Sequence, residues 1–171
     1  PQLYLSGVAS LTREQEQSTE ATVKEVIRRL RSYQTVDGSF SYWPGGTAPN
    51  AWGTVYAIHF LLEAEKKGYL VPEGMKRNAL NDLSRIARNW KPEASYSAES
   101  EEMTQAYRLF VLALGQVAEV GAMNRLKESK TLMSMSRYLL AAGYALVGRP
   151  DVSKELVVKT TALTTACSGY D

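Results

Sequence analysis

The sequence predicts an all-α protein built of helical hairpins, in which inner helices are ringed by outer ones. Three observations support this prediction. Apolar residues recur at helical spacing along the whole chain. Helices with a single apolar face alternate with helices that are apolar on nearly every side. The connections are short, so each consecutive pair of helices is expected to form an αα-hairpin.

The first half of the chain contains three predicted helices. Residues 11–34 form an amphipathic helix that opens at Thr12, with Gln15 at the capping-box spacing. Residues 51–68 are apolar around almost the whole circumference, so this helix is expected to be buried on most sides and to end at Gly68. Residues 73–90, preceded by Pro72, are amphipathic again.

The second half continues the alternation. Residues 101–121 are of the buried type, and a short amphipathic piece follows at 122–128. Residues 132–148 are apolar once more, and the small residues Ala141, Ala142 and Gly143 permit a close approach of another helix. The last predicted helix, 151–166, has a polar face. A weak internal repeat relates the stretches that begin at Thr54 and Thr104.

Composition fits one domain over residues 1–171. Of the 171 residues, 44% are hydrophobic and 22% charged, which is typical of a soluble globular chain. The formal net charge is only +2 and the basic residues are dispersed, which argues against a nucleic-acid surface. No uninterrupted apolar run reaches the roughly 18 residues of a spanning helix, so direct membrane insertion is not predicted.

The stretch "RSYQTVDGSFSYWPGG", residues 31–46, is the densest motif of the chain. Asp37 and Gly38 predict a turn, in which the aspartate caps its own backbone and the glycine adopts a positive φ. Gln34 can donate and accept at once, so it is expected to bond backbone groups at neighbouring helix ends. The aromatic residues are expected to fill the seam between hairpins: Phe40, Tyr42 and Trp43. A structural staple is therefore favoured over a ligand site.

A helix followed by Gln-x-x-Asp-Gly-x-aromatic resembles the repeat signature of α/α-toroid proteins. These include terpene cyclases, prenyltransferase β-subunits, and the thioester domains of the complement and α2-macroglobulin family. Within this set, "SFSYWPGG" followed by "WGTVYAIHFLLEAEKKGYLVP" resembles the bacterial α2-macroglobulin branch, and so does the opening "PQLYL". The resemblance implies a partial α/α toroid, one thioester-type domain over residues 1–171 that is truncated at both ends.

The family's chemistry rests on a Cys-x-x-Gln motif that forms an internal thioester. This chain has no such motif, because its single cysteine, Cys167, is followed three positions later by Tyr170. In the family the motif precedes a stretch like "PQLYL". The resemblance therefore implies a non-catalytic domain of a protease-trapping protein in the periplasm or cell envelope, as part of a lipoprotein. Its implied partners are other domains of the same precursor and target proteases, with no cofactor.

Five residues near the turn are candidates for shielding or docking at that end of the domain: Tyr42, Trp43, Trp52, Tyr56 and His59. The family's acyl-transfer histidine lies in the connection after the Asp-Gly turn, whereas His59 lies within a predicted buried helix. A core role is therefore favoured for His59.

Enzymatic relatives of the fold fit less well. The Asp-x-Asp-Asp acid of terpene cyclases is absent, and Cys167 with His59 is too small a set for zinc. Three acidic residues gather at one helix start, where the helix dipole explains them: Glu99, Glu101 and Glu102. We therefore predict no catalytic, metal or cofactor residue. The alternatives are a toroid hydrolase with a pocket of acidic residues of raised pKa, or a helical protein-binding scaffold.

Overall fold

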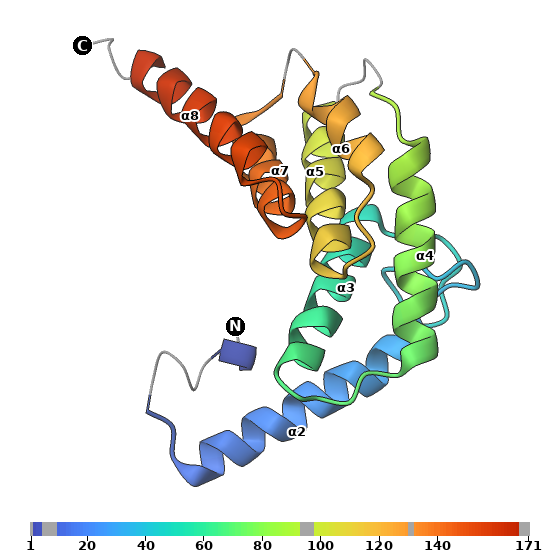
Figure 1. Cartoon of the computed structure of the whole chain (residues 1–171). Helices are drawn as coiled ribbons and strands as arrows, with labels where there is room; N and C mark the ends of the chain where they lie inside the picture. The colour runs from blue at the N-terminus through green and yellow to red at the C-terminus, as the bar shows by residue number, and fades with distance from the viewer. Residues whose placement is uncertain (1, 5–9, 93–97, 130–131, 168–171) are drawn as a thin grey trace. The chain divides into compact units, whose positions relative to one another are not determined.

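The computed structural model describes residues 2–4, 10–92, 98–129 and 132–167, with side chains except those of Gln2 and residues 159–167. The regular elements of this part are helices, and β-structure there is limited to two isolated bridges (Figure 1). They are η1 (Gln2–Tyr4), α2 (Arg13–Leu30), η2 (Arg31–Tyr33), α3 (Ala51–Lys66), α4 (Glu73–Asn89), α5 (Ala98–Leu114), α6 (Val120–Lys127), α7 (Ser134–Leu146) and α8 (Pro150–Cys167). The all-α prediction is confirmed.

The chain divides into two compact units, residues 1–82 and 83–171, and the boundary falls within α4. The first unit holds α2, α3 and the start of α4, and the second holds the end of α4 and helices α5 to α8. Helical packing within each unit is compatible with a partial α/α toroid. No helix in the described part of the chain is long and apolar enough to cross a membrane.

Helix α2 is one-sided, as predicted. Its capping box is complete: the Gln15 amide donates to Thr12 Oγ1 at 3.3 Å, and the Thr12 amide donates to Gln15 Oε1 at 2.9 Å. Of its apolar residues, Val23 and Ile27 are buried. On the exposed side, hydrogen bonds from two arginines of the last turns hold the pKa of the Glu25 carboxyl at about 2.

Helix α3 is buried along one broad face: Thr54, Val55, Ala57, Ile58, Leu61 and Ala64. Trp52 and Tyr56 are 45% and 57% exposed, so the expectation of burial on most sides is wrong for the face that carries them. The helix ends as predicted at Gly68, whose φ is +88°. Hydrogen bonds from Gly68 N to Glu65 O (2.9 Å) and from Tyr69 N to Ala64 O (3.0 Å) complete a Schellman motif.

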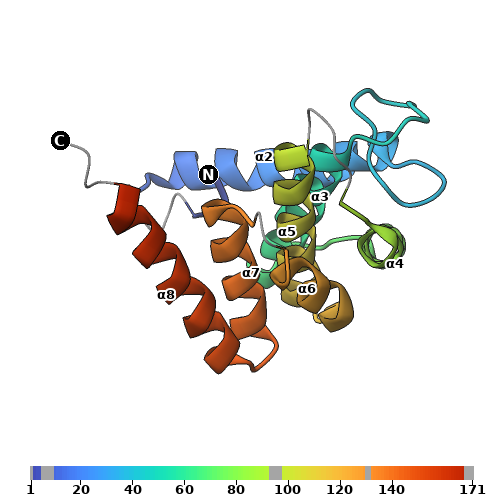
Figure 2. The ribbon, with the colours of Figure 1, turned by 90° about the horizontal axis from the view of Figure 1, so that it is seen from above.

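Helix α5 is the core of the second unit. Eight of its residues between Thr104 and Leu112 are buried, and α7 packs along it, with α8 against α7 (Figures 1 and 2). Gly143 allows the close approach that the sequence predicted. A Cβ there would lie 3.2 Å from Met123 Cε of α6 and 3.6 Å from the Phe110 Cα of α5. Helix α8 buries Val152 and Leu156, one turn apart.

Hydrogen bonds from side chains join different helices in this unit, and one of them completes a helix end. Met133 precedes α7 and its side chain offers no cap, but its amide donates to Glu102 Oε1 of α5 at 2.9 Å. Glu102 is buried, so its explanation by the helix dipole alone is corrected: it caps a second helix. Tyr144 Oη of α7 donates to Asn124 Oδ1 of α6 at 2.7 Å.

Helix α5 ends in the same motif as α3 but without a glycine. Gln116 takes the left-handed position with a φ of +61°, and Val117 N donates to Leu112 O at 3.0 Å. We expect Gln116→Gly to raise the free energy of unfolding by about 0.5 to 1 kcal/mol, because glycine has no Cβ penalty at this φ. Urea denaturation measures the change. Gln116→Ala is the control and should bring no gain; an equal gain would show that the backbone is unstrained.

Candidate functional site

The 34–40 turn is fixed by the amide of Gln34. Its Nε2 donates to Gly38 O at 3.0 Å within the turn and to Met75 O at 2.9 Å in α4. The turn itself is closed by a backbone hydrogen bond from Gly38 N to Thr35 O at 3.0 Å. The Asp37 side chain, which we expected to cap its own backbone, lies exposed. Gln34 thus connects the turn to a helix about 40 residues later in the sequence.

Gly38 brings the turn into direct contact with the backbone of α4. Its φ is +107°, which side-chain-bearing residues rarely adopt. A Cβ at this position would lie only 2.3 Å from Asn78 O and 3.2 Å from Ala79 N. Glycine is therefore required twice, for its φ and for the space. The sequence indicates the first requirement but not the second.

Phe40 follows the turn and is buried, with 2% of its surface exposed. The Thr54 hydroxyl of α3 bonds both of its backbone groups, accepting from Phe40 N at 2.9 Å and donating to Phe40 O at 3.1 Å. Next to it, Ser39 Oγ donates to the buried carboxylate of Asp82 at 2.5 Å. The turn is thereby joined to the start of α3 as well as to α4.

Tyr42 and Trp43 lie outside this core. They are 68% and 71% exposed, so the expectation that they fill a seam beside Phe40 is corrected. Their rings meet edge to face, with centroids 4.9 Å apart and an interplanar angle of 79°. The Ser41 hydroxyl ties the backbone beneath them, with oxygen distances of 2.9 Å to Tyr33 O and 2.7 Å to Trp43 O. The loop that carries them extends beyond the end of α2 (Figure 2).

A second aromatic group follows one face of α3. Trp52, Tyr56 and His59 are spaced four and three residues apart, which places them on the same side of the helix. Tyr56 and His59 also line a hollow of about 390 Å³ against Leu3 and Tyr4 of η1; we call it the α3 hollow. The structure therefore places the five sequence candidates in two groups, a loop pair and a helix face.

Tyr4 fixes η1 to α3. Its hydroxyl donates a hydrogen bond to a carboxylate oxygen of Glu63, and Lys67 Nζ lies 4.5 Å from the centroid of its ring. The sequence does not predict this contact. The contact joins residues 59 positions apart, and no local pattern signals such a pair.

His59 is half-buried within α3. Desolvation lowers the pKa of its imidazole below the ordinary value of 6.5, so the ring is neutral at pH 7. Among the described residues, no group of three His, Cys, Asp or Glu side chains is arranged to hold a metal ion. Cys167 is the last residue of α8, and its side chain lies outside the described part.

The sequence is similar to those of known bacterial proteins. The chain is 27% identical to alpha-2-macroglobulin of Escherichia coli K12 over 162 residues, which is 90% of this chain. It is 31% identical to alpha-2-macroglobulin of Xylella fastidiosa over 128 residues, or 71% of this chain. The chain is a homologue of the bacterial alpha-2-macroglobulins. It spans 10% and 8% of the lengths of these two relatives.

Solved alpha-2-macroglobulins share the fold. The native E. coli protein matches 95% of this chain and 11% of its own, with a TM-score of 0.79 at 23% identity. The Salmonella protein reacted with methylamine matches 94% of this chain and 11% of its own, with a TM-score of 0.78 at 24% identity. An E. coli structure that runs from domain MG7 to the C-terminus matches 94% of this chain and 27% of its own, with a TM-score of 0.77 at 23% identity. No family model matches the sequence.

The contact between Gly38 and α4 makes a quantitative prediction. Gly38→Ala should lower the free energy of unfolding by about 2 to 4 kcal/mol, since it adds backbone strain and a clash. Gly45→Ala is the matched control: its φ is +71° but a Cβ there would meet nothing within 4 Å. That variant should lose only the strain, about 1 kcal/mol. Equal losses in chemical denaturation would refute the close approach.

His59 makes a prediction about pH. The folded chain binds a proton at His59 less readily than the unfolded chain does, so this group stabilises the fold above pH 6.5. The contribution is lost as pH falls from 6.5 through the lower folded-state pKa. The wild-type chain should therefore lose stability relative to His59→Gln between pH 7 and pH 5, in urea titrations about one pH unit apart. Parallel pH profiles of the two proteins would contradict a desolvated imidazole.

Proposed function

We propose that this chain is a helical, non-catalytic module of a bacterial alpha-2-macroglobulin-like protease trap. The observation that supports it is the homology to alpha-2-macroglobulins over most of the chain. The E. coli relative has been described as activated by trypsin and by porcine elastase. We extend that property to the protein that contains this chain, with proteases as its targets and the periplasm or cell envelope, as part of a lipoprotein, as its location.

The exposed aromatic residues are the proposed docking surface of the module. Tyr42, Trp43, Trp52 and Tyr56 are each at least 45% exposed, although aromatic side chains gain most from burial. Aromatic residues are enriched where protein surfaces associate. The proposed occupant is another domain of the same precursor, because the chain spans only about a tenth of the relatives' length. In a parent that carries a thioester, the same rings would keep water from the acyl carbon.

The hydrolase alternative gains little support from the geometry. A retaining or inverting hydrolase needs two opposed carboxylates. The α3 hollow contains one acidic residue, Glu63, and a second hollow in the other unit also contains one, Glu128. The scaffold alternative shares the exposed aromatic surface with the docking proposal, and the experiment below separates the two.

Incubation of the full-length protein with trypsin tests the proposal. A trap should abolish cleavage of a large substrate such as casein while a small chromogenic peptide is still cleaved, because only the large substrate is kept from the enclosed protease. Treatment with methylamine, followed by mass spectrometry, then asks whether a glutamine upstream of Pro1 is modified as a thiol appears. A modified glutamine indicates covalent trapping, and an unmodified one indicates steric trapping. Undiminished casein cleavage in the presence of the folded protein would refute the trap.

A pair of variants tests the docking surface in the same protein. Tyr42→Ser with Trp43→Ser should leave the melting temperature of the 171-residue chain unchanged, since both rings are exposed. In the full-length protein the double variant should hasten limited proteolysis and impair trapping. Val36→Ser, at a fully exposed apolar residue of the same segment, is the control and should change neither. If the double variant behaves like this control, these two residues do not dock.

A further inference from the structure

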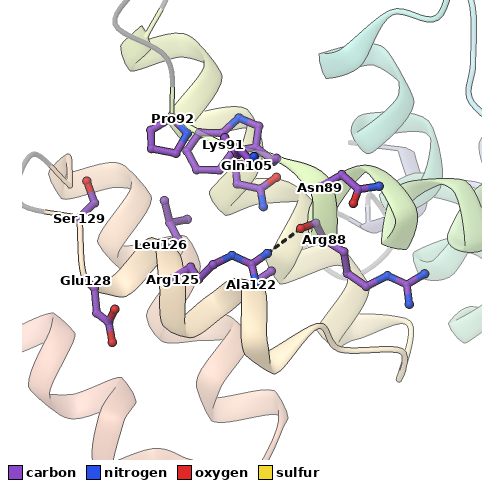
Figure 3. A pocket seen from close by; sticks show the side chains of 11 residues that line it. Arg88, Asn89, Lys91, Pro92, Gln105, Ala122, Arg125, Leu126, Glu128 and Ser129 are labelled. Carbon is purple, nitrogen blue, oxygen red and sulfur yellow. Dashed lines mark hydrogen bonds between the residues drawn. The ribbon is translucent and has the colours of Figure 1, made fainter.

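A hollow of about 460 Å³ lies at the C-terminal end of α4 in the second unit (Figure 3). We call it the α4–α6 hollow. Its apolar walls come from Trp90, Pro92, Ala122 and Leu126. Its polar side chains are mostly hydrogen-bond donors, above all Lys91, Gln105 and Arg125. The volume is within the range of small-ligand sites, and none of the residues discussed for docking contributes to it.

Gln105 is the buried polar group of this hollow, with 1% of its surface exposed. Its Nε2 donates one hydrogen to Ala87 O at 3.0 Å, and its Oε1 accepts a hydrogen bond from Arg108. The amide is thus held in one orientation, with its oxygen occupied. A primary amide carries two N–H donors, so a second hydrogen remains for a ligand.

Arg125 supplies the fixed positive charge. Its Nη2 donates to Arg88 O at 2.7 Å, which orients the guanidinium at the end of α4. In the described part of the chain, no carboxylate lies within ion-pair distance of Arg125 or Lys91. The Glu128 carboxylate points away from Gln105 in Figure 3. Arg88 is paired with Glu119 at 3.6 Å.

The carbonyl end of a helix normally disfavours an anion. Here two of the terminal carbonyls of α4 already accept hydrogen bonds, Ala87 O from Gln105 and Arg88 O from Arg125. Besides Asn89, Glu128 and Ser129, the lining supplies N–H donors and positive charge next to apolar walls. This combination suits a ligand that has acceptor oxygens, a negative charge and an apolar body.

We propose that the α4–α6 hollow binds a carboxylate attached to an apolar group. Arg125 and Gln105 donate hydrogen bonds to the carboxylate oxygens, and Lys91 adds positive charge at the rim. Trp90 and Leu126 contact the apolar body of the ligand. Two sources share this chemistry, a small organic acid and the C-terminal residue of a peptide. The inference is independent of protease trapping, because it uses residues of the second unit alone.

Titration of the 171-residue chain with N-acetyl-phenylalanine tests the proposal, with the indole N–H signal of Trp90 followed by NMR. N-acetyl-phenylalanine amide is the uncharged control. We expect the acid to bind with a dissociation constant of about 1 mM or below and the amide about tenfold more weakly. A tetrapeptide that ends in phenylalanine distinguishes the two sources. If the tetrapeptide binds more tightly than N-acetyl-phenylalanine, the site is for peptide C-termini. If the two bind equally, the site is for small organic acids.

Variants connect the binding to the named side chains. Lys91→Gln and Arg125→Gln should each raise the dissociation constant of the acid by roughly fivefold or more. Neither variant should change the binding of the amide. Arg149→Gln, at an exposed arginine that directly precedes α8 and does not line the hollow, should leave binding unchanged. Lys91→Gln keeps the test valid if Arg125→Gln lowers the melting temperature, because Lys91 is exposed. The proposal would be overturned if the Trp90 signal did not shift or if acid and amide bound equally. It would also be overturned if neither variant changed the binding of the acid.

Discussion

The first unit depends on one backbone-to-backbone contact, between Gly38 and the second turn of α4. A side chain at residue 38 would overlap Asn78 O, so the turn can lie this close only because it has none. Gln34 fixes the same contact through its hydrogen bond to Met75 O. Once the turn is held, Phe40 reaches the hydroxyl of Thr54, and the start of α3 is placed. A sixteen-residue segment therefore positions two helices.

The second unit is held by a different constraint: side chains from other helices satisfy backbone groups at helix ends. Glu102 accepts from the amide that precedes α7, and Gln105 donates to a terminal carbonyl of α4. Arg125 donates to the next carbonyl of α4. Each bond joins two helices, so each fixes their register as well as one polar group. Two of the three donors or acceptors also line the α4–α6 hollow, which connects the packing of the unit to the inferred ligand site.

The aromatic residues near the turn differ in burial and in the backbone element that carries them. Phe40 is buried and bonded through its backbone, whereas Tyr42 and Trp43 project from a loop whose backbone is tied by Ser41. Trp52 and Tyr56 are carried on a helix that is buried on its opposite face. Rigid supports reduce the entropy lost when such side chains are covered by a partner. This arrangement fits a surface that docks within a larger protein.

The sequence by itself determined the helical class, the capping box at Thr12, the stop at Gly68 and the close approach at Gly143, because each depends on local spacing or on one residue's conformational range. It also carried the resemblance that the comparisons support. Only the tertiary structure decided which aromatics are buried, that Glu102 caps a distant helix, and that Tyr4 binds Glu63. Those outcomes depend on contacts between residues far apart in the chain, and hydrophobicity alone does not distinguish a core ring from an exposed one. The α4–α6 hollow belongs to the same class, since its donors come from α5, α6 and the segment after α4, which meet only in the folded chain.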